Sequence, residues 1–302
     1  MALAIASRNF PDLRNLNTPF FIISIPGSLC LVDLCLKFLP KEQDVVIVAN
    51  GLEKTELNWI KENLETDEII KIKWTVDHGA ALDLLFDCYD KNFGIIDYDC
   101  FVLDASYLDE MKKIDINSMM NALFIYENRK LNLDIPKTYI LFFNNEIIRK
   151  IKQKFKVNSR IIHYRKLTNQ VKKKLLTLGI DQYNHIDHKN YFDTLRVIYL
   201  LGLTEGYRCN YLLKYPAVSS VSQKVFHVGA GNNTEKINNA WNTRGTYLWR
   251  RALESCQHKE LQDYYYIKYG MMKSWEIFEK VPKICEEIGN GFFEFVNQIV
   301  GK

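Results

Sequence analysis

The first hundred residues alternate between short continuous apolar runs and longer stretches in which apolar positions recur at helical spacing. The continuous runs predict buried strands, and turn-forming residues close several of them. Expected strands cover residues 18–25, 44–49, 69–74 and 93–96. Expected helices cover 29–39 and 55–64, the latter capped by Thr55, and a third begins at His78. Strands that alternate with helices imply right-handed crossovers and a largely parallel sheet, so the pattern predicts an α/β fold.

The strand over 93–96 runs directly into the acidic triplet Asp97-Tyr98-Asp99. Strand alternation points Asp97 and Asp99 to the same side, at the carboxyl end where open α/β sheets bind ligands. Two carboxylates in one small space repel each other unless a cation lies between them, and Mg²⁺ or Mn²⁺ is the usual cation. Most Asp-x-Asp triplets are solvated turns, so the apolar residues on both sides of this one are what favours a metal site.

Composition narrows the classes of protein that remain. The 302 residues are 47% hydrophobic and 25% charged, as in ordinary globular proteins, and a net charge of +4 does not indicate a nucleic-acid partner. The seven cysteines form no Cys-x-x-Cys pair, which argues against a zinc site or a disulfide framework and favours a cytoplasmic location. No apolar stretch reaches the roughly 18 residues of a membrane span. We expect Cys30, Cys35, Cys88 and Cys100 to fill the core.

The order of these elements resembles the nucleotide-sugar-binding half of GT-A-type glycosyltransferases, closest to the family 2-like group that carries a DxD motif. The resemblance rests on Asn50-Gly51 after the second strand, on the helix that begins His78-Gly79-Ala80, and on Ile95 to Asp99. Farther along, the helical stretch that begins at Phe192-Asp193-Thr194 and the segment Phe226-His227-Val228-Gly229 look like the acceptor-side helix and the late His-x-Gly segment of the same group.

The resemblance implies roles for single residues. Asp99 would bind the metal that bridges the donor diphosphate, and Asp97 would contact the ribose or assist the metal. His227 would add a ligand from a loop, made flexible by the small residues 229–233, although a lone histidine is more often structural. An imidazole ligand favours Mn²⁺ over Mg²⁺. Pro26, Gly27 and Asn50 lie at the ends of the first two strands and would frame the donor nucleoside.

The catalytic base and the helix that precedes the triplet each leave two interpretations open. Asp193 would be the base that accepts the proton of the acceptor hydroxyl, or it would cap its helix. Inverting members of the group commonly show Glu-Asp at this place, whereas this chain has Phe192 before Asp193. Asp77 and His78 would approach the nucleobase or cap the helix that they begin, and capping is favoured.

The rest of the chain predicts an acceptor side and an appendage. Residues 139–143 are expected to form a strand. The stretch 146–174 is rich in Lys and Arg and favours a solvated basic helix, with an approach surface for an anionic acceptor or lipid headgroup as the alternative. We expect a GT-A-like domain over residues 1–237 and a helical, aromatic-rich appendage over 238–302. Its aromatic residues are expected to be mostly core, with a minority that line an acceptor groove or form a subunit contact in a homo-oligomer.

The sequence therefore predicts a metal-dependent glycosyltransferase that moves a sugar from a nucleotide-sugar donor, UDP- or GDP-linked, to a hydroxyl of a carbohydrate or lipid-linked acceptor. Peripheral contact with the inner face of the membrane is compatible with such an acceptor. Two alternatives remain open. One is a haloacid dehalogenase-like phosphatase with Asp97 as its nucleophile. The other is a glycosyltransferase-like protein that binds a partner without catalysis.

Overall fold

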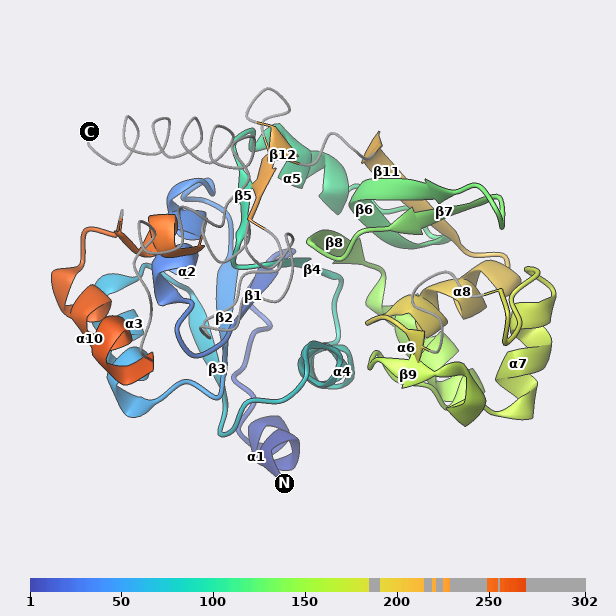
Figure 1. Cartoon of the computed structure of the whole chain (residues 1–302), viewed down its shortest axis with the longest axis horizontal. Coiled ribbons are helices and arrows are strands. Elements are labelled where there is room, and N and C mark those ends of the chain that lie inside the picture. The colour runs from blue at the N-terminus through green and yellow to red at the C-terminus, as the bar shows by residue number, and fades with distance from the viewer. Residues whose placement is uncertain (185–190, 215–218, 221–224, 229–248, 255, 270–302) are drawn as a thin grey trace.

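The computed structural model describes residues 1–184, 191–214, 219–220, 225–228, 249–254 and 256–269 (Figure 1). Its centre is an eight-stranded sheet in the order β11-β6-β8-β4-β1-β2-β3, with β7 paired to β6. The strands are β1 (Phe20–Ser24), β2 (Val45–Asn50), β3 (Glu68–Ile72), β4 (Phe93–Ile96), β6 (Ser118–Asn128), β7 (Leu133–Pro136), β8 (Ile140–Phe143) and β11 (Arg208–Lys214). The strands expected from the sequence over 18–25, 44–49, 69–74, 93–96 and 139–143 are thus confirmed.

The sheet is mixed and mostly parallel. Strand β1 pairs in parallel with β2 and β4, β2 with β3, and β6 with β11. Strand β8 is antiparallel to both β4 and β6, and β7 is antiparallel to β6. The predicted α/β fold class is therefore confirmed, and β8 marks the place where the chain departs from the parallel pattern.

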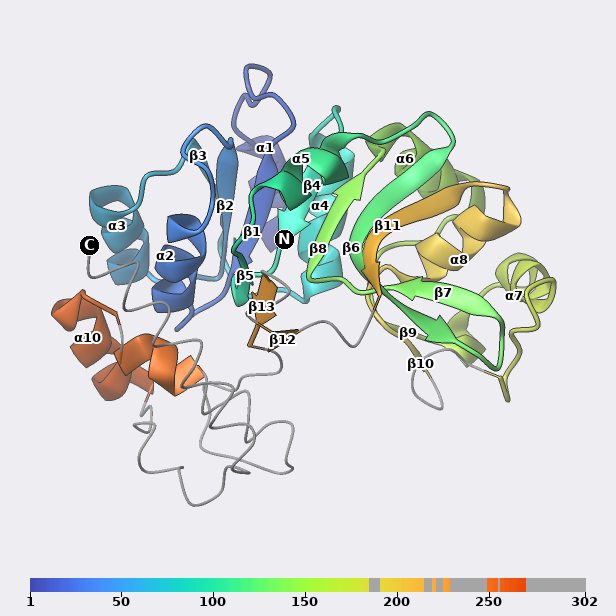
Figure 2. The same cartoon turned by 90° about the horizontal axis from the view of Figure 1, so that it is seen from above.

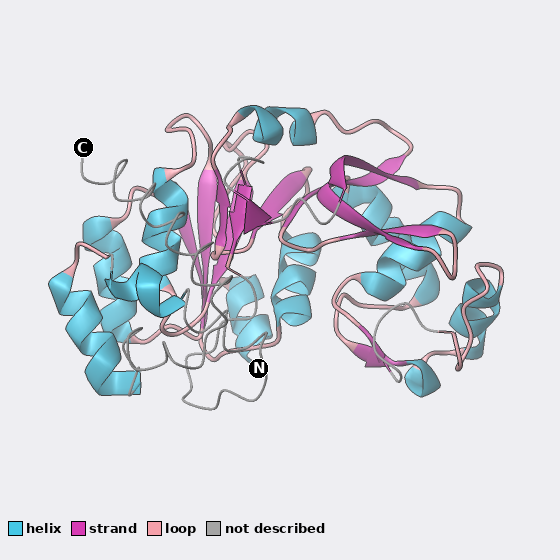
Figure 3. Cartoon of the chain, turned by 45° about the horizontal axis from the view of Figure 1, so that its top comes forward, coloured by secondary structure: helices cyan, strands magenta, loops and turns pink. Residues whose placement is uncertain are grey.

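Two hydrophobic layers cover the two faces of the sheet, and Figure 3 shows the strands running between two groups of helices. Phe20 and Ile22 of β1 belong to one layer, whereas Phe21 and Ile23 belong to the other. Because both faces of the strand are buried, its sequence is a continuous apolar run instead of an alternating one. The helices are α1 (Ala2–Arg8), α2 (Leu29–Lys37), α3 (Lys54–Asn63), α4 (His78–Cys88), α5 (Ser106–Lys112), α6 (Asn145–Phe155), α7 (Asn169–Leu176), α8 (Arg196–Thr204) and α10 (Lys259–Tyr269).

Capping residues fix where two of these helices begin. Asp77 is the N-cap of α4, and its side chain accepts a hydrogen bond from Ala80 N at 2.9 Å, so the predicted capping role is confirmed. The prediction that Thr55 caps the preceding helix is wrong. Glu53 is the N-cap of α3 and forms a capping box with Glu56, an arrangement that the sequence pattern of Ser or Thr caps does not reveal.

A second, three-stranded sheet joins distant parts of the chain. It contains β5 (Cys100–Val102), β13 (Val225–His227) and β12 (Ser219–Ser220), all antiparallel (Figure 2). Strand β5 follows β4 after one turn, so β13 lies beside the end of β4. A further antiparallel pair joins β9 (Ile162–His163) to β10 (Tyr191–Phe192), and β10 lies just before α8 in the chain.

The aromatic C-terminal part packs on the layer that includes α2 and α3. Helix α10 lies beside α3 in Figures 1 and 2. Tyr265 is fully buried, and its hydroxyl donates to Glu56 Oε1 at 2.9 Å and accepts from Leu29 N at 3.2 Å. Trp249 is buried as well, so the core role predicted for the aromatic residues is confirmed for these two. The predicted boundary at 237/238 and the aromatic residues of 238–248 and 270–302 lie outside the described residues.

The basic segment is helical only in part. Its apolar positions Ile147, Ile148, Ile151 and Phe155 are buried on α6, as predicted. After α6 the chain forms β9, a short 3₁₀ helix (Tyr164–Lys166) and α7, so a single helix over 146–174 is wrong. Several of its lysines form ion pairs within the described part of the chain: Lys150 with Glu146, Lys152 with Asp83 and Asp87, and Lys154 and Lys174 with Glu205. These pairs favour the solvated surface.

Of the cysteines expected in the core, Cys30, Cys35 and Cys100 are buried and Cys88 is half-buried. No helix among the residues described is long and apolar enough to cross a membrane.

Candidate metal and donor site

Asp97, Asp99 and His227, called here the acid–histidine cluster, meet at the carboxyl end of β4. Each offers one ligand atom, and these atoms all lie within 4.8 Å of one another. The Nε2 atom of His227 is 3.4 Å from Asp99 Oδ1. Asp99 and His227 are buried, whereas Asp97 is half-buried. The three residues that the sequence singled out as metal ligands therefore lie together.

Local structure explains the meeting, although not in the way the sequence suggests. Strand β4 ends at Ile96, and Asp97 to Asp99 form a turn in which Cys100 N donates to Asp97 O at 2.9 Å. The turn, and not strand alternation, brings the carboxylates together. His227 is the last residue of β13 and pairs with Cys100, so its predicted place in a loop is wrong. Residues 229–233 lie outside the described part of the chain.

The electrostatics of the cluster suit a divalent cation. Burial and the neighbouring Asp99 carboxylate raise the pKa of Asp97 well above its usual range. His78, the first residue of α4, has its Nε2 4.0 Å from Asp97 Oδ1, but burial lowers its pKa, so it is a weak counter-charge at neutral pH. Two carboxylates and an imidazole are a donor set that Mn²⁺ accepts. The residues present therefore fit the metal that the fold family implies.

Asp193 belongs to the segment just before α8, and the structure tests whether it caps that helix. The N-cap of α8 is Leu195, with a left-handed backbone at φ +65°, and it has no side-chain cap. The Asp193 carboxylate instead accepts from Thr194 N at 2.8 Å. The capping role is therefore wrong. Asp193 is exposed, and its charge acts against the effect of burial on the pKa of His78, so it lies near His78.

Pro26, Gly27 and Asn50 lie at the same edge of the sheet as the cluster, because β1, β2 and β4 are parallel and these residues follow or end β1 and β2. Two of their polar groups are already used. Gly27 N donates to Glu56 Oε1 at 2.9 Å, and the buried Asn50 amide exchanges two hydrogen bonds of 2.9 Å with the Val76 main chain. These bonds fix the loops after β1 and β2, and the predicted role of the three residues in donor binding stays a prediction.

Sequence reasoning missed Tyr139, which precedes β8. Its carbonyl oxygen accepts from Asp97 N at 2.7 Å, and its ring stacks on the His227 ring with 3.7 Å between centroids. The strand that follows was predictable from its apolar run. The pairing of β8 with β4 was not, because register between strands of different segments leaves no local mark on the sequence.

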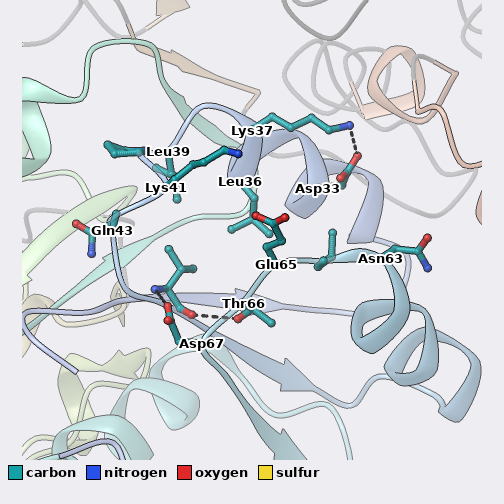
Figure 4. A pocket seen from close by; sticks show the side chains of 13 residues that line it. Asp33, Leu36, Lys37, Leu39, Lys41, Gln43, Asn63, Glu65, Thr66 and Asp67 are labelled. Atoms are coloured by element: carbon teal, nitrogen blue, oxygen red, sulfur yellow. Dashed lines mark hydrogen bonds and ion pairs between the residues drawn. The ribbon is translucent and has the colours of Figure 1, made fainter. Parts of the chain in front are cut away.

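A cavity of about 620 Å³ lies elsewhere, and Figure 4 shows its lining side chains. They come from the segments in front of β2 and β3, so the cavity is at the edge of the sheet opposite to Asp97. Several polar side chains of the cavity are paired with other lining residues. Asp33 forms an ion pair with Lys37 at 2.8 Å, Asp67 accepts a hydrogen bond from Val45 N at 2.6 Å, and Thr66 donates one to Val45 O at 3.0 Å. The cavity is therefore separate from the acid–histidine cluster.

Comparison with known proteins finds a family model that matches part of the chain. Residues 6–148 match the model described as StrH glycosyltransferase N-terminal domain, and no curated protein matches the chain. Similar solved structures include the mannosyltransferase PcManGT from Pyrobaculum calidifontis in complex with GDP-Man and Mn²⁺ (11% identity, 49% of this chain and 52% of that one, TM-score 0.35). They also include the bifunctional glycosyltransferase WbbM (9% identity, 85% and 52%, TM-score 0.43). A third is the glycosyltransferase GlyE of Streptococcus pneumoniae TIGR4 (10% identity, 87% and 63%, TM-score 0.42).

The matched part of each of these three proteins is less than two thirds of its own length. Their TM-scores are all below 0.5, so the family match carries more weight than they do. That match includes β1, β2, β4 and the triplet that supplies both carboxylates of the cluster. Residues 6–148 therefore resemble the N-terminal domain of StrH-type glycosyltransferases, and the resemblance to GT-A-type glycosyltransferases that the sequence predicts is confirmed.

Proposed function

We propose that this chain is a metal-dependent glycosyltransferase that moves a sugar from a nucleotide-sugar donor to a hydroxyl acceptor. The observation that carries the proposal is the acid–histidine cluster at the carboxyl edge of the sheet, within a chain whose residues 6–148 match a glycosyltransferase family. Open α/β sheets bind their ligands at this edge. The expected donors are UDP- or GDP-linked sugars, and the expected acceptor is a carbohydrate or a lipid-linked precursor.

The cluster would hold the cation through Asp99, His227 and Asp97. When bound, a divalent ion would neutralise the negative charge that develops on the departing nucleoside diphosphate, without proton transfer. The chain's own contribution is to keep these ligand atoms together in a largely buried place, where electrostatic attraction is stronger than in water. Asp97, the half-buried member, faces the side from which a donor would approach.

Asp193 is our candidate for the base that takes the proton from the acceptor hydroxyl. It is exposed, it does not cap α8, and it lies near His78, which in turn lies 4.0 Å from Asp97. A carboxylate between solvent and the donor side can accept a proton from a hydroxyl that enters from solvent. Residues 1–237 would thus bind both substrates, and residues 238–302 would support the donor side through contacts such as Tyr265 with Glu56.

The phosphatase alternative has less support than the transferase. His227 within the cluster and the family match over residues 6–148 both favour the transferase.

A thermal-shift screen of UDP, GDP, CDP and TDP, each with and without Mn²⁺ or Mg²⁺, tests the proposal without knowledge of the acceptor. A ligand that binds only the folded protein raises its melting temperature. At a ligand concentration 100-fold above Kd, the free energy of unfolding increases by about 2.7 kcal/mol. We expect one nucleotide to give a metal-dependent shift that Asp99→Asn abolishes. Metal-independent shifts, or none together with hydrolysis of a generic phosphate ester, would contradict the proposal.

A further inference from the structure

Tyr139 touches two members of the acid–histidine cluster by two different groups. Its main-chain carbonyl accepts from Asp97 N at 2.7 Å, and its ring lies against the imidazole of His227. Asp97 follows β4 and His227 ends β13, so one residue connects parts of the cluster that come from two sheets. Tyr139 is half-buried, and no motif of the sequence draws attention to it.

Strand register places Tyr139 there. Strand β8 is antiparallel to β4, with Ile140 opposite Ile96, so the next position along brings Tyr139 opposite Asp97. On the other side, His227 pairs with Cys100 and Val228 N donates to Asp99 O at 2.9 Å. The backbone of both carboxylates is therefore held by hydrogen bonds, and the imidazole of His227 contacts the Tyr139 ring and Asp99.

The geometry of the ring contact suits a metal ligand. The two ring centroids are 3.7 Å apart and the ring planes differ by 23°, so the rings are stacked face to face. An imidazole binds a metal through a nitrogen lone pair in the plane of its ring, and a neighbour on its face leaves that edge free. This edge of the ring carries Nε2, which lies 3.4 Å from Asp99 Oδ1. Stacking thus restricts rotation of the imidazole without blocking its ligand atom.

We propose that Tyr139 is a positioning residue, whose ring holds the His227 imidazole in the orientation that the cluster needs to bind a divalent cation. The inference rests on the metal site of the proposed function. A ligand side chain that is already ordered loses less conformational entropy when the ion binds, and groups that orient metal ligands contribute to affinity for that reason.

The test measures binding of Mn²⁺ alone by isothermal titration calorimetry to the full chain and its variants. Tyr139→Leu removes the ring but keeps apolar volume and the carbonyl, and Tyr139→Phe keeps the ring. We expect Mn²⁺ to bind Tyr139→Leu roughly 10-fold more weakly or worse, as for other residues that orient metal ligands. Tyr139→Phe should bind within about twofold of the wild type, because the stack is retained. Tyr126→Leu, which removes a tyrosine ring from β6 outside the cluster, is the matched control and should also bind normally.

The outcomes separate this inference from the function on which it rests. Normal Mn²⁺ binding by Tyr139→Leu, with binding lost in Asp99→Asn, would overturn the role of Tyr139 and leave the metal site standing. Absence of Mn²⁺ binding by the wild type would contradict the metal site and the role of Tyr139 together. Equal losses in Tyr139→Phe and Tyr139→Leu would assign the effect to the hydroxyl and overturn the stacking role. Circular dichroism checks that each variant is folded, and Tyr139→Met takes the place of a leucine variant that is not.

Discussion

Among single residues, Asp97 carries an electrostatic cost in the metal-free protein. Its pKa is raised by burial and by Asp99, and His78 beside it has a lowered pKa and is neutral in neutral solution. A raised pKa means that the folded state holds the proton more tightly than the unfolded chain. The ionised carboxylate therefore lowers the free energy of unfolding as the pH rises above about 4, the usual value for Asp.

Asp97→Asn should therefore stabilise the metal-free protein at pH 7 and weaken its binding of Mn²⁺. Removal of one of two repelling carboxylates should gain about 1 kcal/mol, or roughly 2 °C in melting temperature for a protein of this size. The gain should vanish below about pH 4, where the wild-type carboxyl is protonated in both states. Melting curves with and without Mn²⁺ measure it, with the exposed Asp109→Asn as control. A lower melting temperature for metal-free Asp97→Asn at pH 7 would show that the charge is already compensated.

At the scale of elements, the turn between α5 and β6 joins β6 to β11 through Asp115. Its carboxylate accepts from Ser118 Oγ at 2.7 Å and from Asn117 N at 2.8 Å, and it lies 3.3 Å from Arg208 of β11. These contacts lower the pKa of Asp115 to about 2, from the model-peptide value of 3.8. Because this pKa is lower than in the unfolded chain, the Asp115 carboxylate stabilises the fold at pH values above the unfolded pKa. The stabilisation is lost as the pH falls through about 2.

Asp115→Asn should accordingly lower the melting temperature most at neutral pH. The difference from the wild type should shrink between about pH 4 and about pH 2, as Asp115 becomes protonated. Differential scanning calorimetry across this range measures the difference directly. A gap that is constant from pH 7 to pH 2 would show that the carboxylate charge contributes nothing.

The sequence predicted the positions of strands better than it predicted the ends of helices or the contacts within the site. Continuous apolar runs located β1, β2, β3, β4 and β8, because burial on both faces requires such runs. The helix ends were harder to predict: Glu53, not Thr55, caps α3, since a glutamate can form a capping box that the usual Ser or Thr signal does not show. The convergence of Asp97, Asp99 and His227 followed from family resemblance. The turn and the β5–β13 pairing that produce it depend on long-range register, as does the contact with Tyr139.

At the scale of the whole molecule, the fold places its ligand candidates at one edge of the sheet and a cavity of about 620 Å³ at the other. The acid–histidine cluster combines the turn before β5 with the end of β13. Helix α10 is linked to the loop after β1 through Glu56, which accepts hydrogen bonds from the Tyr265 hydroxyl and from Gly27 N. Under the proposed function, the donor would bind at the carboxyl edge of β1, β2 and β4, with Asp193 on the acceptor side.

Release of nucleoside diphosphate from a panel of UDP- and GDP-sugars, followed with and without Mn²⁺, tests this assignment most directly. A glycosyltransferase that lacks its acceptor still transfers the sugar slowly to water. We predict release from one donor class that requires Mn²⁺, is lost on chelation with EDTA, and falls roughly 100-fold in Asp99→Asn as a transition-state contact is removed. Release that is unaffected by EDTA and by Asp99→Asn, or no release from any donor, would contradict a metal-dependent transferase built on the acid–histidine cluster.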